Sequence, residues 1–419
     1  MKKLNQLLAV LALGLASITA AHAAADQELL KRGEYLARAG DCMACHSAAG
    51  KPSFAGGLAI DSGHGIIYST NITPDKEHGI GNYSEEQFSK AVRHGVRADG
   101  TPLYPAMPYP SYAKVSDDDI HALYTYFMDG VKPVAVASPP SEMSFPFNIR
   151  WGMKLWNVFF ANDKPFKEQA GWSAEIKRGA YLVEGLGHCG SCHTPRGFAM
   201  NEKASDSAQE QFLSGGDLNG WAVPSLRGMP HWSAQDIVDY LQTGRNKTAS
   251  VAGEMSLVVE HSTSHLKQED LNAIAAYLKT LSTPPARNDG ARPQGAQATA
   301  KKLTAAKDLT LGERLYLDNC AACHFVTGKG APGIFPVLDG ASIANADNPT
   351  GLLHVILAGA RTPSTEKAPS ILVMPGFAHR LSDKEAAELA SFVRQGWGNQ
   401  GGAVSEREAA KVRASLEKH

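Results

Sequence analysis

The sequence has 419 residues, of which 43% are apolar and 20% charged, with a formal net charge of −1 at neutral pH. This length suits about three domains, and the composition is that of an ordinary soluble globular protein. The near-neutral charge gives no electrostatic footprint for nucleic acid, so a nucleic-acid partner is not expected.

The N-terminal residues 1–23 have the features of a secretory signal peptide. Lys2 and Lys3 supply the positive start, residues 7–15 form a short apolar run, and Ala21-His22-Ala23 is a cleavage signal. Cleavage would remove two lysines and no carboxylate, which changes the formal net charge from −1 to −3. No later stretch reaches the ~18 apolar residues of a spanning helix. We therefore expect an exported protein in the periplasm.

One pattern, Cys-x-x-Cys-His, occurs three times and uses all six cysteines of the chain. The pattern is typical of c-type haem attachment, in which two thiols bond to one porphyrin and the adjacent histidine binds its iron. A thioredoxin-like pair or half a zinc site would explain one copy, but the copies lie 147 and 131 residues apart. The predicted haem attachment residues are Cys42, Cys45, Cys189, Cys192, Cys320 and Cys323, and the predicted iron ligands are His46, His193 and His324.

The three motifs lie in three repeats of more than 100 residues. Each repeat opens with a helical stretch that carries a glycine and a tyrosine, and it closes with an amphipathic helix. Ser116 and Ser382 are expected to cap two of the closing helices, whereas Lys267 provides no such cap. The opening pairs are Gly33 and Tyr35, Gly179 and Tyr181, and Gly312 and Tyr316, and the closing helices are expected over 118–127, 270–281 and 383–394.

This pattern resembles the cytochrome c fold, in which a glycine of the first helix lets an aromatic residue of the last helix cross closely. The prediction is an all-α protein of three tandem cytochrome c-like domains, with no disulfide because each cysteine is assigned to a haem. The predicted segments are a first domain over 24–135, a linker with an aromatic segment over 136–170, a second domain over 171–283, an extended, mobile linker over 284–307, a third domain over 308–400, and a charged helical tail over 401–419.

A methionine before each closing helix is the candidate for the sixth iron ligand, which would raise the haem potential relative to a second histidine. Met107 lies 61 residues after His46, and Met374 is the only methionine after His324. Met255 lies 62 residues after His193. In the second repeat Met200 follows its histidine too closely, whereas Met229 is not excluded by spacing. We predict Met107, Met255 and Met374 as the axial ligands.

Two other features have more than one interpretation. Residues 145–160 hold six aromatic side chains with Arg150 and Lys154, which suits a membrane-facing or quinone-facing surface, although packing between the first and second repeats is favoured. Asn71 and Thr73 could donate hydrogen bonds to haem propionates or shape the turn before Pro74.

The chain resembles the three-haem cytochrome c subunits of membrane-bound periplasmic gluconate, sorbitol, fructose and alcohol dehydrogenases. The resemblance covers nearly the whole mature chain, and it favours Met255 over Met229. The strings that carry it are TNITPD at 70–75, HGIG at 78–81, LYPAMP at 103–108, CHTPR at 192–196, GEM at 253–255, EHS at 260–262, FPVL at 335–338, MPGF at 374–377 and GWGN at 396–399.

The resemblance implies a chain that transfers electrons and catalyses no substrate oxidation itself. Its partner would be a flavin-dependent (FAD) or quinoprotein dehydrogenase acting on a sugar acid, polyol or alcohol, often with a small third subunit. Ubiquinone or a terminal oxidase would accept the electrons. Some members have a hydrophobic C-terminal anchor, but residues 406–419 are charged, so attachment to the periplasmic face of the inner membrane would be peripheral.

Two other functions remain open at this stage. The chain could be the cytochrome subunit of a molybdenum hydroxylase that oxidises aldehydes or N-heterocycles, because such enzymes use a similar three-haem partner. It could also be a haem peroxidase, which would need one iron without a methionine ligand.

Overall fold

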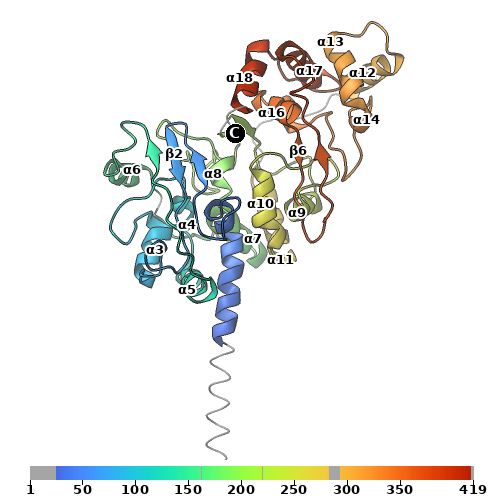
Figure 1. Cartoon of the computed structure of the whole chain (residues 1–419). Helices are drawn as coiled ribbons and strands as arrows, with labels where there is room; N and C mark the ends of the chain where they lie inside the picture. The colour runs from blue at the N-terminus through green and yellow to red at the C-terminus, as the bar shows by residue number, and fades with distance from the viewer. Residues whose placement is uncertain (1–24, 162, 219, 283–292, 417–419) are drawn as a thin grey trace, which may run out of the picture. The chain divides into compact units, whose positions relative to one another are not determined.

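The computed structural model describes residues 25–161, 163–218, 220–282 and 293–416. The predicted signal peptide therefore lies outside the described residues. The chain forms two compact units, an N-terminal unit of residues 1–158 with 163–166 and a C-terminal unit of residues 159–162 with 167–419. Both are mostly helical (Figure 1), with short antiparallel strands added to the predicted all-α architecture.

The N-terminal unit contains the first repeat. A helix over residues 25–39 opens it. Its three strands form one antiparallel sheet in the order β1-β2-β3, in which Ile60 faces Ile67 and Ile66 faces Glu142. The remaining elements are α2 Cys42–His46, β1 Ala59–Asp61, β2 Gly65–Tyr68, α3 Glu85–His94, α4 Tyr109–Tyr112, α5 Asp117–Thr125, the π-helical turn η1 Tyr126–Gly130, β3 Glu142–Met143 and α6 Gly152–Phe160, the last of which continues into the C-terminal unit.

The C-terminal unit contains the second and third repeats. The second repeat has α7 Ala174–Tyr181, η2 Leu182–Leu186, α8 Gly190–His193, β4 Gly216–Leu218, β5 Trp221–Val223, α9 Ala234–Thr243, α10 Met255–His261, η3 Thr263–His265 and α11 Gln268–Thr280. The third has α12 Pro293–Ala305, α13 Leu311–Asn319, α14 Ala321–His324, α15 Ser342–Asn345, α16 Thr350–Ala358, β6 Ala360–Arg361, β7 Val373–Met374, α17 Asp383–Gln395 and α18 Glu406–Leu416.

The predicted close crossing of the first and last helices is confirmed in all three repeats. A β-carbon built on Gly33 would lie 2.5 Å from Cβ of Tyr126. The same carbon on Gly179 would lie 2.8 Å from Cβ of Tyr277, and on Gly312 it would lie 2.9 Å from Cβ of Phe392. Real side chains do not approach so closely, so only glycine lets each pair of helices meet.

The predicted helix caps are also confirmed. The Ser116 hydroxyl accepts a hydrogen bond from the Asp119 amide, and Ser382 with Glu385 forms a complete capping box. Lys267 makes no side-chain cap at the start of α11. The closing helix of the first repeat ends differently from the prediction, because its last turn, η1, is π-helical.

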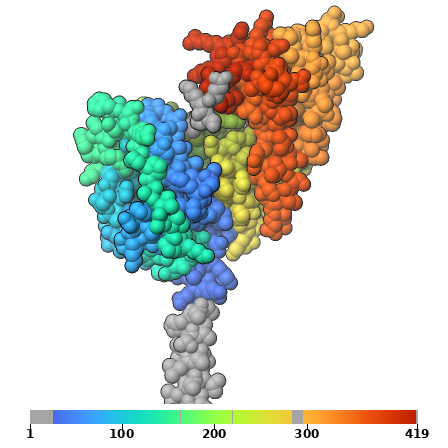
Figure 2. All heavy atoms as spheres, viewed as in Figure 1, coloured from blue at the N-terminus to red at the C-terminus, as the bar shows by residue number. Residues whose placement is uncertain are grey.

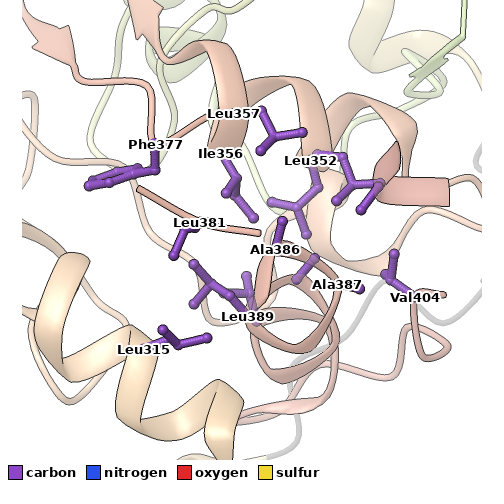
Figure 3. Close-up of a cluster of buried hydrophobic side chains, with 14 of the residues drawn as sticks. Leu315, Leu352, Ile356, Leu357, Phe377, Leu381, Ala386, Ala387, Leu389 and Val404 are labelled. Atoms are coloured by element: carbon purple, nitrogen blue, oxygen red, sulfur yellow. The ribbon is translucent and has the colours of Figure 1, made fainter. Parts of the chain in front are cut away.

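The apolar core of the third repeat lies between α13, α16 and α17 (Figure 3). Leu315 comes from α13, Leu352 and Ile356 from α16, and Leu389 from α17, and all four are buried. The described part of the charged tail predicted over 401–419, which ends at residue 416, packs into this core. Its helix α18 is amphipathic, and Ala409 and Val412 are buried against the other helices.

Part of the linker predicted to be extended over 284–307 is helical, because its residues 293–305 form α12. Leu303 on α12 is buried in the core of the third repeat, and Lys302 forms an ion pair with Glu313 of α13. The Ala-rich sequence of 293–305 is compatible with a helix, and burial of Leu303 stabilises it. Residues 283–292 lie outside the described part of the chain.

Most of the large apolar side chains of the aromatic segment 145–160 are exposed. Phe145 is 80% exposed, Trp151 70% and Phe159 69%. In Figure 2 the teal-green residues of this segment form part of the visible surface. Two aromatic residues of the helix are packed: the Trp156 ring contacts Tyr109 edge-on with centroids 6.3 Å apart, and the Phe160 ring contacts Phe198 edge-on at 5.8 Å.

In the described residues no helix combines the length and the apolar character needed to cross a bilayer.

Candidate haem-binding sites

Each Cys-x-x-Cys-His motif ends on a short helix directly after the opening helix of its repeat. The motif helices are α2, α8 and α14, and in each one the histidine is the last residue. All six cysteines are free thiols. One helical turn places two cysteines three positions apart on the same side, which suits attachment to a single planar ring.

The three motif histidines share one hydrogen bond. Nδ1 of His46 lies 2.6 Å from the carbonyl oxygen of Thr70. Nδ1 of His193 lies 2.8 Å from the carbonyl oxygen of Pro224, and Nδ1 of His324 lies 2.9 Å from that of Pro336. A carbonyl oxygen only accepts, so Nδ1 carries the proton in each ring. The Nε2 lone pair is therefore available to a metal ion.

Burial favours the neutral form of these groups. It lowers the pKa of His46, His193 and His324, although the carbonyl hydrogen bond acts in the opposite direction. Neutral imidazole is the form that binds iron. Burial also raises the pKa of the first thiol of each motif, at Cys42, Cys189 and Cys320, to about 12. Both shifts therefore favour uncharged side chains at the three motifs.

Met107 lies in the loop between α3 and α4. Its carbonyl accepts a hydrogen bond from the Tyr109 amide at 2.8 Å, so the loop leads directly into α4. On the same helix, the Tyr112 hydroxyl donates to the carbonyl of Gly40, two residues before Cys42, at 2.6 Å. The segment that carries Met107 therefore packs against the start of the first motif.

Met255 is the first residue of α10. Two residues earlier, Gly253 lies against the Trp221 ring, since a β-carbon built on this glycine would be 3.1 Å from the ring. Trp221 belongs to β5, and this strand precedes Pro224, the acceptor for His193. The Met255 loop and the carbonyl that holds His193 are thus on adjoining segments. Of the competitors, Met200 is 46% exposed, and the carbonyl of Met229 accepts a hydrogen bond from Lys279 at 2.7 Å.

Met374 lies on β7, where it faces Ala360 of β6. Its side chain is partly buried against the core of the third repeat, and Cys320 packs against the same core. His324 of this motif is itself buried. The structure therefore places the methionine and the first thiol of the third repeat against the same apolar core.

Asn71 and Thr73 act as a turn within the protein. The Asn71 amide nitrogen donates to the carbonyls of Val134 and Val136 at 2.8 and 3.0 Å, and its oxygen accepts from the amide and the hydroxyl of Thr73. Both donor hydrogens of Asn71 are thereby used. These contacts support the turn interpretation and hold the segment after η1 beside the first motif.

The acceptor carbonyls of Thr70, Pro224 and Pro336 were not predicted from the sequence. A backbone acceptor has no residue signature, so no pattern search would find it. Thr70 lies within TNITPD and Pro336 within FPVL, but these strings carry only the family resemblance. They do not predict that either carbonyl binds a histidine.

The helix crossings and the oriented motif histidines define a c-type cytochrome. A family model for cytochrome c matches residues 176–282 and 309–397. The chain is 45% identical to the cytochrome c subunit of the quinone-dependent alcohol dehydrogenase of Gluconobacter oxydans (strain 621H), in an alignment that covers 99% of this chain and 88% of that protein.

Two further relatives are also cytochrome subunits of dehydrogenases. The gluconate 2-dehydrogenase cytochrome c subunit of Pantoea cypripedii is 46% identical, over 96% of this chain and 94% of that protein. The fructose dehydrogenase cytochrome subunit of Gluconobacter japonicus is 39% identical, over 94% of this chain and 84% of that protein. The chain therefore belongs to the family of dehydrogenase cytochrome c subunits, which are electron-transfer proteins and not the catalytic enzymes.

Proposed function

We propose that this chain carries three covalent haem c groups in three cytochrome c domains and serves as the electron-transfer subunit of a periplasmic dehydrogenase. The observation that supports this most strongly is the threefold recurrence of the histidine-to-carbonyl hydrogen bond. The same donor and acceptor types recur beside each cysteine pair, at sequence separations of 24, 31 and 12 residues. A chance arrangement of unrelated cysteine motifs would not repeat this geometry.

Each repeat has the residue types that covalent haem attachment and iron ligation require. In each repeat the two cysteines would form thioethers to one porphyrin, the histidine would bind the iron through Nε2, and Met107, Met255 or Met374 would supply the second iron ligand from the protein. Bound haem supplies an iron that alternates between the ferric and ferrous states. The chain's own carbonyl groups orient each imidazole, and a methionine ligand would leave the iron without an open coordination site. These features suit electron transfer and oppose the peroxidase alternative.

The partner is proposed from the relatives. Their names identify them as the cytochrome subunits of alcohol, gluconate and fructose dehydrogenases, which act on CH–OH groups. We propose a separate catalytic subunit, containing FAD or a quinone cofactor, that oxidises an alcohol, a polyol or a sugar acid. Electrons would pass through this chain to ubiquinone or a terminal oxidase, and a small third subunit would complete the complex.

Attachment to the periplasmic face of the inner membrane is proposed through the exposed aromatic segment. Residues 145–160 include Arg150 and Lys154 and no carboxylate, on a chain whose formal net charge is −1. Exposed Trp and Phe beside basic residues are typical of proteins that bind at the surface of anionic lipids.

The haem count tests the proposal directly. The mature protein from its native host should contain three haem groups per chain, measured by intact mass and by haem-to-protein ratio. Cys→Ala replacement of both cysteines in one motif should lower the count to two. A ratio of two in the unmodified protein would contradict the proposal. Co-purification of a dehydrogenase, followed by ubiquinone-analogue reduction with alcohols, polyols and sugar acids, tests the partner.

A further inference from the structure

A loop of the second repeat is hydrogen-bonded to the loop that holds the histidine of the third motif. The carbonyl of Thr248 accepts a hydrogen bond from the Val337 amide at 2.8 Å. The carbonyl of Asn246 accepts a second one from the Gly333 amide at 3.2 Å. Both loops belong to the C-terminal unit. Residues 246–248 are therefore a docking platform for residues 333–337.

One peptide group joins this platform to His324. The carbonyl of the Pro336–Val337 peptide accepts from Nδ1 of His324 at 2.9 Å, and the N–H of the same peptide donates to Thr248. The two hydrogen bonds form a continuous chain from the imidazole to the Thr248 carbonyl. Hydrogen bonds in such a chain polarise one another, so donation to Thr248 makes the Pro336 oxygen a stronger acceptor.

Asn246 directs the Thr248 carbonyl. Its side-chain oxygen accepts from the amides of Thr248 and Ala249 at 2.9 and 2.8 Å, and its side-chain nitrogen donates to the carbonyl of Asp236 at 3.1 Å. The side chain is buried, at 5% exposure. These three bonds fix the turn over 246–249 and thereby the direction in which the Thr248 carbonyl points.

We propose that Asn246 is a positioning residue for the third haem: through Thr248 and the Pro336–Val337 peptide it strengthens the hydrogen bond of His324 and lowers the reduction potential of the iron that His324 binds. A stronger acceptor at Nδ1 gives the imidazole more anionic character. A more basic ligand stabilises the ferric state relative to the ferrous state. The proposal rests on the proposed function, because it requires a haem at His324.

The first repeat has the same chain of two hydrogen bonds, from the histidine through a peptide group to a further acceptor. Here the final acceptor is a side chain. The carbonyl of the Thr70–Asn71 peptide accepts from His46, and the amide of that peptide donates to the Ser138 hydroxyl at 2.9 Å. In the first repeat the last link can therefore be deleted by one substitution. In the third it belongs to the backbone of another repeat, so the potential of the third haem would depend on contact between the second and third repeats.

The test is spectroelectrochemical titration of the full-length holoprotein. Asn246→Ala should raise the midpoint potential of one haem and leave the other two unchanged. We expect the ferrous-to-ferric ratio of that haem at fixed potential to rise about twofold to tenfold, where tenfold corresponds to 59 mV for one electron. The haem affected is identified as the one whose wave is altered by Met374→Ala. Asn246→Ser keeps an acceptor oxygen and should give a smaller shift.

Matched variants separate this effect from general disturbance. Lys247→Arg alters an exposed side chain of the same loop but keeps the positive charge that lies 3.3 Å from Asp236, so it should leave all three potentials unchanged. Ser138→Ala should raise the potential of the first haem, whereas Ser141→Ala, which removes a hydroxyl that accepts from the Tyr68 amide, should not. The Nδ1 proton signal of His324 should also move upfield in Asn246→Ala, which reports a weaker hydrogen bond independently of the potential.

Unchanged midpoints in Asn246→Ala and Asn246→Ser, with three haems retained, would overturn the proposal. A shift of all three haems together would also overturn it, because it would indicate a global change. Fewer than three haems in the unmodified protein would instead contradict the proposed function. The two failures are therefore distinguishable.

Discussion

Gly179 lies against the backbone of Ala273, so that a β-carbon on this glycine would be 1.9 Å from the Ala273 carbonyl oxygen. Helices α7 and α11 therefore meet at backbone contact, and this crossing sets the frame that carries the second motif. We expect Gly179→Ala to force the helices apart and to destabilise the protein by about 3 kcal/mol or more. Thermal unfolding followed by circular dichroism would measure the loss.

The control for this substitution is Gly152→Ala. Gly152 is also helical, but its added β-carbon would meet no atom within 4 Å. Alanine has the higher helix propensity, so this variant should be as stable as the parent or slightly more stable. Equal unfolding temperatures for Gly179→Ala and the parent would mean that the crossing does not depend on glycine.

Replacement of each predicted axial methionine should open one iron to an external ligand. Met107→Ala, Met255→Ala and Met374→Ala should each gain one carbon monoxide-binding haem per chain, detected in the absorption spectrum of the reduced protein. Met200→Ala and Met229→Ala are the matched controls and should bind no carbon monoxide. Carbon monoxide binding by Met229→Ala, with none by Met255→Ala, would show that Met229 is the axial ligand in the second repeat.

The ion pair between α12 and α13 should make the stability depend on acid pH. Burial acts to raise the pKa of Glu313, but hydrogen bonds from Lys302 and Thr310 together hold it below its ordinary value of 4.5. A lowered carboxyl pKa contributes stability above the unfolded-state pKa, and this contribution is lost as the pH falls through the folded-state value.

Glu313→Gln should therefore cost about 0.5–1 kcal/mol at pH 7, since Gln keeps a capping side chain but lacks the charge. The difference between variant and parent should shrink toward zero below pH 4. Denaturant unfolding at several pH values would measure it, with the exposed Glu366→Gln as a control for loss of one negative charge. A difference that is constant from pH 7 to pH 3 would show that the charge of Glu313 is not the cause.

The exposed aromatic segment should bind anionic lipid. We expect the double variant Trp151→Ser and Phe159→Ser to lose at least tenfold in affinity for phosphatidylglycerol-containing vesicles in a sedimentation assay, because two bulky apolar side chains are removed from the surface. Ile371→Ser changes an apolar side chain that is 45% exposed elsewhere and should bind as the parent does. Equal binding by all three proteins would show that Trp151 and Phe159 do not bind lipid.

The parts of the site that were predictable are local in sequence. The two cysteines and the histidine of each motif are within five residues, and their spacing alone indicates the chemistry. The Gly179 crossing was also predictable, because a glycine before the motif and an aromatic residue in the closing helix recur at similar positions. The helical caps at Ser116 and Ser382 depend on neighbours three residues away, which is again local information.

The parts that were not predictable depend on tertiary contacts. Helix α12 follows a proline-rich stretch, and only its burial through Leu303 and its ion pair to Glu313 show why it forms. The exposure of Trp151 and Phe159 could not be deduced either, since a dense aromatic run is equally compatible with a core. The docking of Val337 on Thr248 joins two repeats through backbone atoms, which have no signature in the sequence.

The acceptors for the three motif histidines, at Thr70, Pro224 and Pro336, are main-chain carbonyls. No point substitution can delete such an atom, whereas an Asp or Asn in the same role would be lost by a single codon change. Copies of an ancestral gene segment could therefore accumulate replacements at these positions while the imidazole kept its tautomer. The acceptor residue is a threonine in the first repeat and a proline in the other two, yet the same hydrogen bond orients the imidazole in all three.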